Sequence, residues 1–312
     1  MTISIQPLRE ADLPEADRVC RLAFGTHLGL PDPLSFLGDA DFVRTRWRAR
    51  PDAAIGAYSD GRLIGSSFAS QWGDFGFFGP VTVHPEYWGR GVAQRLLEPT
   101  LALFEQWAVR QVGLFTFPDS PKHHALYGRY GFAKQELTPV MAKPVAAQAA
   151  GGWSAYSTLV PEARETSLAA CRALADQVSP GLDLTREIAA VAAQGLGDTV
   201  LVHEGAKLTG FAVCHVGAGS EAGSGVAYVK FGAARPGADA AGRFERLLSA
   251  CEAFAHARGA QRLSAGVNAA RRDAGQLMAD RGFVAELQGV AMQRPDAPGH
   301  NRPDCFVVDD WR

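Results

Sequence analysis

Two glycines at the start of a predicted helix offer the clearest chemistry in this sequence. Val81 and Val83 alternate with polar residues ahead of a proline, a pattern typical of a short strand. Gly89 and Gly91 follow, and apolar residues then recur at a spacing near that of a helix. The first N–H groups of such a helix lack intrahelical partners, and glycine lets an anion approach the backbone closely. This turn therefore predicts a phosphate-binding site.

Two other phosphate-binding signatures do not fit this turn. A dinucleotide-binding fingerprint needs a third glycine and an acidic residue after the next strand, and neither is found at the required place. A nucleotide P-loop needs Gly-Lys followed by Ser or Thr, and the sequence contains no such run. For a glycine pair considered alone, a tight turn that binds nothing is the structural alternative.

A second motif, Leu126-Tyr-Gly-Arg-Tyr-Gly-Phe132, follows the predicted strand 112–117. With both motifs in this order, residues 1–146 resemble the GNAT superfamily of acyl-CoA-dependent N-acetyltransferases. In that family a strand leads, through a turn with two spaced small residues, into a helix that holds the CoA pyrophosphate. A later helix carries Leu-Tyr, three variable residues and Gly-Phe, and this motif matches at every fixed position. The earlier motif departs at Trp88, where the family usually has Gln or Arg.

The resemblance implies acetyl-CoA as the acyl donor and gives roles to individual residues. Those implied to contact CoA are Val81, Val83, Trp88, Gly89, Arg90, Gly91, Val92, Ala93, Ser120 and Tyr127. Tyr127 is also the implied catalytic acid, because the departing thiolate needs a proton. The structural alternative for Tyr127 is a tyrosine that packs in the core. Lys122 is a further cation that could contact phosphate.

The sequence does not specify a general base. Asp74 could receive a proton from the amine or pair with a cationic substrate, and a solvated loop carboxylate is its structural alternative. His123 lies four residues before Tyr127, hence on the same helix face, where it could orient the tyrosine or CoA. His84 and Glu86 are further candidates, although the position of His84 before a proline favours a structural role.

The second half of the chain repeats the first. Two matches share an offset of 151 residues, Leu247-Leu248 with Leu96-Leu97 and Gly282-Phe283 with Gly131-Phe132. A third match, Lys207–Gly210 with Arg62–Gly65, has an offset of 145. Such a repeat predicts two copies of one fold. The expected class is α+β, with a mixed, mostly antiparallel sheet flanked by helices in each of two tandem GNAT folds.

The predicted boundaries follow from this repeat and from composition. A catalytic GNAT domain with the acetyl-CoA site is expected at residues 1–145, and a small-residue linker at 146–152. A second GNAT-like domain is expected at 153–297, and a polar C-terminal tail with a short edge strand at 298–312.

The second copy is predicted to be degenerate. At the positions of Ala93, Tyr127 and Trp88 it has Phe244, Met278 and Asp239. The phenylalanine would fill the space of a phosphate, the methionine has no transferable proton, and the aspartate adds a negative charge at an anion site. This copy is therefore expected to cover the first domain or to complete its acceptor cleft.

Composition excludes several classes of protein. The formal net charge is −2 with mixed signs, which argues against a nucleic-acid platform or an anionic membrane surface. No signal peptide or membrane-spanning run is evident. Five scattered cysteines without C-x-x-C spacing predict free thiols in a reducing cytoplasm, with Cys305 the one expected at the surface. His123 and His124 would point to different helix faces, so no metal site is expected.

The leading hypothesis is an N-acetyltransferase that moves an acetyl group from acetyl-CoA to a primary amine of a small molecule, by direct attack in a ternary complex. One alternative is a non-catalytic acyl-CoA sensor or partner-binding module. Another is an acetyltransferase for a protein or peptide amine. The sequence leaves open the acceptor, the acyl-chain preference and the oligomeric state, a homodimer included.

Overall fold

The computed structural model describes residues 2–147 and 151–312 of the chain, so the predicted linker at 146–152 lies partly outside the described residues. The first half contains β1 (Ile3–Pro7), α1 (Leu13–His27), α2 (Phe42–Ala49), β2 (Ala54–Ser59), β3 (Arg62–Trp72), β4 (Phe75–Phe78), β5 (Thr82–Val83), α3 (Val92–Gln106), β6 (Gln111–Thr116), α4 (Pro121–Gly128) and β7 (Ala133–Pro144). The second half contains β8 (Trp153–Ala155), α5 (Pro161–Val178), α6 (Thr185–Gln194), β9 (Gly197–Glu204), β10 (Lys207–Gly217), β11 (Gly223–Ala234), α7 (Ala240–Ala257), β12 (Arg262–Gly266), α8 (Arg272–Asp280), β13 (Val284–Arg294) and β14 (Val307–Asp309).

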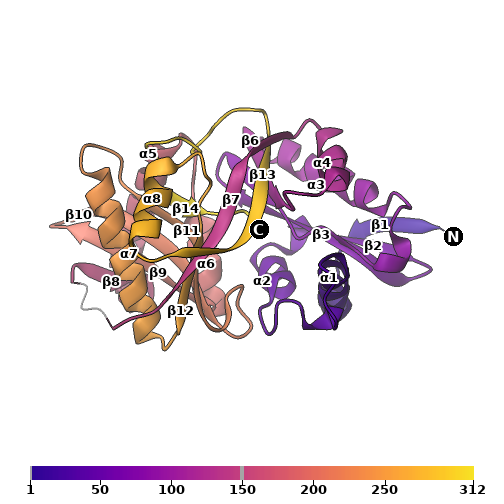
Figure 1. The fold of residues 1–312 in the computed structure, drawn as a ribbon, viewed down its shortest axis with the longest axis horizontal. Coiled ribbons are helices and arrows are strands. Elements are labelled where there is room, and N and C mark those ends of the chain that lie inside the picture. Colours follow the sequence, from indigo (N-terminus) through magenta and orange to yellow (C-terminus); the bar gives the residue numbers. More distant parts are fainter. Residues whose placement is uncertain (1, 148–150) are drawn as a thin grey trace.

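Both halves belong to one continuous sheet. Its order over the described residues is β1-β2-β3-β4-β6-β13-β7-β12-β11-β10-β9-β8, with β5 paired beside β3 and β14 beside β11. Among the described strands, only β4–β6 and β11–β12 pair in parallel, so the sheet is mixed and mostly antiparallel, as predicted. In Figure 1, β7 (magenta) and β13 (yellow) run side by side between the two halves.

The two halves exchange their last strands. β13, from the end of the second half, pairs with β6 of the first half, from Val290 opposite Thr116 to Arg294 opposite Val112. β7, from the end of the first half, pairs with β12 of the second half. Each copy of the fold is therefore completed by a strand from the other copy.

Helices cover both faces of the sheet because neighbouring strand residues point to opposite sides. In β3, Leu63 packs in a cluster with Leu13 of α1, whereas Ile64 packs with Leu96 of α3. In β10, Val213 packs with residues of α5 and α6, whereas Cys214 packs with residues of α7. The molecule thus has three layers, with a core on each face of the sheet.

From the sequence, the aromatic and β-branched residues in 71–83 predict one central strand. In the structure these residues form the end of β3 and the two short strands β4 and β5. Gly73, at φ +67°, makes the turn from β3 to β4, and residues 79–81 separate β4 from β5. This interruption opens the sheet beside β6.

The predicted tail is part of the core. β14 pairs with β11, and Asp309 accepts a hydrogen bond from the fully buried Arg271 and pairs with His300 at 2.8 Å. Cys305, expected at the surface, is 6% exposed because the segment folds back onto the sheet. The expected short strand is β14, and its place in the core was not predicted; the expectation of an exposed thiol at Cys305 was wrong.

Candidate active site

The sheet opens between β5 and the end of β6. β4 pairs with both β3 and β6, but β5 pairs with β3 alone. The N–H of His84 donates to the carbonyl of Ile64 at 2.8 Å. Because peptide groups alternate in direction along a strand, those of Val81 and Val83 face the opening. A bound chain can therefore hydrogen-bond to this edge as an additional strand would.

The predicted anion turn has the backbone geometry that it needs. Gly89 and Gly91 have φ values of +77° and +75°, in the left-handed region that favours glycine. Gly91 is the N-cap of α3, and no side chain caps this helix. The first N–H groups of α3 are thus left for a ligand, and the helix dipole favours a negative one.

Trp88 joins the turn to the strand. Its indole N–H donates to the carbonyl of Val83 at 2.7 Å, and the ammonium of Lys122 lies 5.5 Å from its ring centroid. The carbonyl of Val83 is therefore already hydrogen-bonded within the protein. The N–H of Val83 and the peptide groups of Val81 remain available to a ligand. Arg90 lies over the ring of Tyr87, at 5.2 Å from its centroid.

Two cavities meet at this opening. The first, termed the groove, has a volume of about 410 Å³. It is lined by most of the residues predicted to contact CoA: Val81, Val83, Trp88, Gly89, Gly91, Val92, Ala93 and Tyr127. The second, termed the cleft, has a volume of about 420 Å³ and lies between the two halves. Five residues line both cavities and form what we term the shared wall: Phe24, Val81, Phe117, His123 and Tyr127.

Tyr127 lines both cavities. The side chain comes from α4 and is 8% exposed, and its ring packs on Phe78 at 5.9 Å. Within the described residues the hydroxyl makes no hydrogen bond to the protein. Burial raises the pKa of Tyr127 to about 12, so the hydroxyl keeps its proton at neutral pH and can donate it.

His123 is neutral at physiological pH. Burial, and then the nearby His27, lower the pKa of His123 to about 4. Its Nδ1 is buried without a hydrogen-bond partner in the described structure. The ring lies 5.2 Å from that of His27 and 5.7 Å from that of Phe117. His27, from the end of α1, also lines the groove and was not predicted, because nothing near it in sequence marks it.

The structure does not bring Asp74 to this site. Asp74 lies at the start of β4, whereas the opening follows the end of β4, and its carboxylate pairs with Arg110 at 2.7 Å. Ser120 is the N-cap of α4 and accepts from the N–H groups of His123 and His124 through its carbonyl, outside the lining of the groove. The Nδ1 of His84 accepts from the N–H of Glu86 at 3.3 Å, a structural role.

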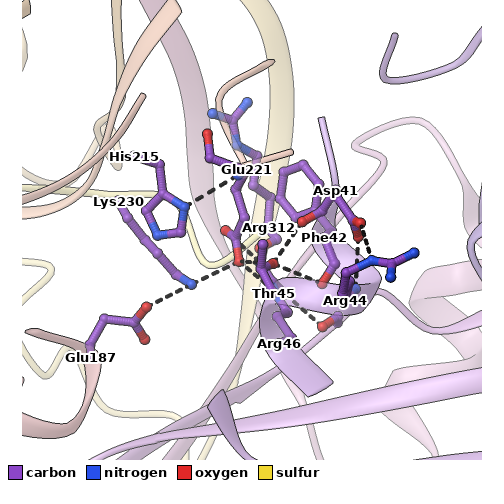
Figure 2. Close-up of polar contacts among 12 residues, drawn as sticks. Asp41, Phe42, Arg44, Thr45, Arg46, Glu187, His215, Glu221, Lys230 and Arg312 are labelled. Atoms are coloured by element: carbon purple, nitrogen blue, oxygen red, sulfur yellow. Dashed lines mark hydrogen bonds and ion pairs between the residues drawn. The ribbon is translucent and has the colours of Figure 1, made fainter. Parts of the chain in front are cut away.

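The second half supplies the far side of the cleft. Its contributions include Glu221, Tyr228, Arg262, Gln288, Trp311 and Arg312. Figure 2 shows Glu221 between two cations: Arg46 contacts it at 3.0 Å and Lys230 at 2.8 Å. Burial alone would raise the pKa of Glu221, but the charges of Arg46 and Lys230 outweigh it and hold this pKa well below its usual range. Arg46 also donates to the carbonyl of Gly79 at 2.5 Å, next to the opening in the sheet.

The equivalent turn of the second half has a different geometry. Helix α7 begins at Ala240, so Gly242, which aligns with Gly91, lies inside the helix rather than ahead of it. Phe244 and Met278 are both fully buried in the core, and Asp239 accepts from Arg246 at 2.8 Å. This copy thus differs from the first in three ways: it has the bulky Phe244 in place of Ala93, Met278 in place of a tyrosine, and an Asp239 carboxylate that is paired with Arg246.

Comparison with known proteins agrees with this geometry. Residues 24–132 match the model of the Acetyltransferase (GNAT) family. No curated protein matches the sequence. Among solved structures, the chain is similar to a protein from Pyrococcus horikoshii assigned as an acetyltransferase, with 14% identity and a TM-score of 0.70 over 99% of this chain and 95% of that one. It is also similar to a GCN5-related N-acetyltransferase from Sphaerobacter thermophilus, with 16% identity and a TM-score of 0.58 over 95% of this chain and 96% of that one.

Two further observations bear on the class of protein. No helix in the described part of the chain is long and apolar enough to cross a bilayer. Residues 2–147 and 151–312 contain no group of three His, Cys, Asp or Glu side chains placed to hold a metal ion. The matched residues include the glycine turn, the opened sheet and Tyr127, so residues 24–132 form a domain of the GNAT acetyltransferase family.

Proposed function

We propose that this protein transfers an acetyl group from acetyl-CoA to the primary amine of a small molecule held in the cleft. The observation that carries the proposal is the shared wall, because Tyr127 and His123 face the groove and the cleft together. A donor in the groove and an acceptor in the cleft would meet there. Holding two reactants in this way replaces a bimolecular encounter with an intramolecular step.

The groove suits the shape and charge of CoA. The uncapped start of α3 and the left-handed glycines at 89 and 91 would hold the pyrophosphate, with Lys122 beside them. The peptide groups of Val81 and the N–H of Val83 would hold the pantetheine arm. When bound, acetyl-CoA supplies the activated thioester.

The residues around the opening supply the remaining needs of the reaction. Tyr127 holds a proton that can pass to the leaving thiolate. The backbone N–H groups of Val81 and Val83 on the open edge can donate to a developing oxyanion. Cys20 lines the cleft, but burial raises its pKa to about 12, so it is not a thiolate nucleophile. These features support direct attack of the amine rather than an acyl-enzyme.

The cleft supports a small acceptor with an apolar body. Its volume of about 420 Å³ lies in the range of small-molecule sites, and residues of both halves enclose it. Aromatic side chains dominate the part contributed by the first half: Phe24, Phe36, Phe42, Phe78, Phe115 and Phe117. Glu221 also lines the cleft, but its charge is already neutralised by Arg46 and Lys230, which lie outside the cleft lining.

The substitution Tyr127→Phe tests the proposal. Turnover with acetyl-CoA and an apolar primary amine should fall by about a hundredfold or more, since general acid catalysis contributes on that order. The affinity for CoA should stay within about twofold, because the ring and its packing remain. Thiol release measures the first quantity and calorimetry with CoA the second.

Tyr130→Phe is the matched control, because Tyr130 lies near the same helix and its hydroxyl donates to the carbonyl of Gln94 at 3.3 Å, away from the cleft. It should leave turnover near that of the wild type. Unchanged turnover in Tyr127→Phe would remove Tyr127 from the mechanism. CoA binding without thiol release for any amine in a broad panel would instead support a sensor.

A further inference from the structure

A third cavity lies where the two copies of the fold meet. It has a volume of about 690 Å³ and is lined by α2 and β3 of the first half and by α6 and His215 of the second; we term it the seam cavity. At the offset of 145 residues found in the sequence, Ser70 of β3 aligns with His215 of β10, and both line it. Equivalent elements of the two copies thus face each other across this space. None of the groove residues lines it.

We propose that the seam cavity binds a small anion with two or more negative charges, such as a polycarboxylate or a phosphate compound. Its cationic side chains are Arg46, Arg48, Arg50, Arg186 and Lys230, and its carboxylates are Asp52, Glu187 and Glu221. With His215 neutral, the lining has two more positive than negative charges. A concave site with this excess attracts anions.

The carboxylates of the cavity are already paired. Glu221 pairs with Arg46 and Lys230, and Glu187 pairs with Lys230 at 2.9 Å (Figure 2). Asp52 lies 3.5 Å from Arg50. In the described part of the chain, the two cations that remain without a carboxylate partner are the exposed Arg48 and Arg186.

Arg48 and Arg186 are the unmatched cations. In the described residues neither has an acidic partner or a hydrogen-bond acceptor. A third arginine, Arg50, is held next to them, because it stacks on Trp107 with its guanidinium carbon 3.7 Å from the ring centroid and donates to Gln71 at 2.7 Å. Burial lowers the pKa of Arg50, and repulsion from Arg186 adds to this shift. An anion between these side chains would relieve the repulsion.

His215 adds an unpartnered donor at the floor of the seam cavity. Its Nδ1 accepts from the N–H of Glu221 at 3.2 Å, so in the neutral ring the proton is on Nε2. The side chain is 1% exposed, and Nε2 has no hydrogen-bond partner in the described structure. In Figure 2 the free ring nitrogen points to the side on which Lys230 and Glu187 lie. An unpaired buried donor is unfavourable, and an oxygen atom of a bound anion would satisfy it.

Calorimetric titration of the full chain with citrate and with inorganic phosphate tests this proposal and separates the two sources of negative charge. Saturating CoA is included so that the turn at Gly91 does not compete for the probes, and ionic strength is held constant. At least one probe should bind saturably, with one site per chain. The readout is affinity rather than turnover, so failure here would leave the proposed acetyl transfer untouched.

The double substitution Arg48→Gln and Arg186→Gln should weaken that binding at least tenfold, because it removes two charge-assisted contacts at exposed positions that can change without harm to the core. Arg44→Gln is the matched control, since Arg44 lies on the same helix, pairs with Asp41 and does not line the cavity. Its affinity should equal that of the wild type. Absence of saturable binding by both probes, or equal affinity in the double variant, would overturn the proposal.

Discussion

Burial shifts the pKa values of two neighbouring residues in opposite directions. It raises that of Tyr127 to about 12 because the phenolate would be the charged form, and it lowers that of His123 to about 4 because the imidazolium would be. Both side chains are therefore uncharged between about pH 6 and pH 9. The shared wall can donate a proton from the tyrosine, but the histidine is too weak a base to remove one from an alkylammonium ion in solution.

The pH dependence of kcat/KM should accordingly follow the acceptor rather than these two residues. We expect the rate to rise with pH until the pKa of the free amine is passed, because only the neutral amine attacks. Two acceptors whose pKa values differ by about one unit should show inflections displaced by the same amount. Steady-state rates from pH 6 to pH 9 measure this. An inflection at one fixed pH for both amines would instead reveal a titrating group of the enzyme.

Glu221 carries the clearest prediction for stability. Glu221→Gln keeps the shape of the side chain but removes the charge that Arg46 and Lys230 face, so the free energy of unfolding should fall by about 3 kcal/mol at pH 7. Urea unfolding measures this. Glu105→Gln is the control, because that side chain is 73% exposed and should change stability by less than about 0.5 kcal/mol.

The contribution of Glu221 to stability should depend on pH. Since the folded pKa of Glu221 is lowered from its ordinary value of 4.5, its contribution is present above that pH and is lost as the pH falls. The difference between wild type and Glu221→Gln should therefore shrink in acid. A difference that stays constant from pH 7 to pH 3 would contradict this assignment.

At the scale of elements, the start of α3 depends on a backbone conformation that most residues avoid. Gly91→Ala should raise the KM for acetyl-CoA about tenfold with little change in kcat at saturation, because strain at φ +75° disturbs the N–H groups that would hold phosphate. Initial rates at varied acetyl-CoA measure the effect.

Gly205→Ala provides the matched control. Gly205 has φ +58° in the hairpin between β9 and β10 and has open space around it. The cost in stability should be similar, about 1 kcal/mol, while the KM for acetyl-CoA is unchanged. A KM that rises equally in both variants would show that the effect is one of general destabilisation.

Elements that depend on residues close together in sequence could be predicted, and elements that depend on contacts between distant residues could not. The β2–β3 hairpin and the turn into α3 follow from Asp60-Gly61 and from the spaced glycines, which act within a few residues. The interruption of the central strand between β4 and β5 was not predicted. It depends on where β4 stops pairing with β6, a strand over thirty residues away in sequence. A short strand near Phe306-Val307 was predicted, but nothing in its sequence shows that it pairs with β11.

The same division holds for the site. Its groove side comes from two motifs, and Tyr127, Gly91 and their neighbours, which those motifs single out, line one cavity. Its far side comes from Glu221, Tyr228 and other residues of the second half, which share no motif with the first. Asp74 lies at the other end of β4 and pairs with Arg110, because closeness in sequence to β4 does not tell which end of the strand faces the two cavities.

At the scale of the molecule, neither half holds a complete sheet. Residues 1–147 expressed alone should aggregate or stay unfolded, because β6 would lose β13 and β7 would lose both of its neighbours. Co-expression with residues 151–312 should restore a soluble complex, detected as one peak in gel filtration. Appending residues 284–294 to the first fragment through a flexible linker should improve its solubility. A monomeric, folded 1–147 fragment would contradict the structural importance of the exchange.

The crossed strands also set an order for events during synthesis. The part of the sheet formed by the first half lacks β13 until about 150 further residues have been translated after β7. At typical rates of 5–20 residues per second, this delay lasts on the order of ten seconds. The nascent chain must keep an unpaired edge throughout that interval, so slowing translation of residues 150–280 should lower the yield of soluble protein.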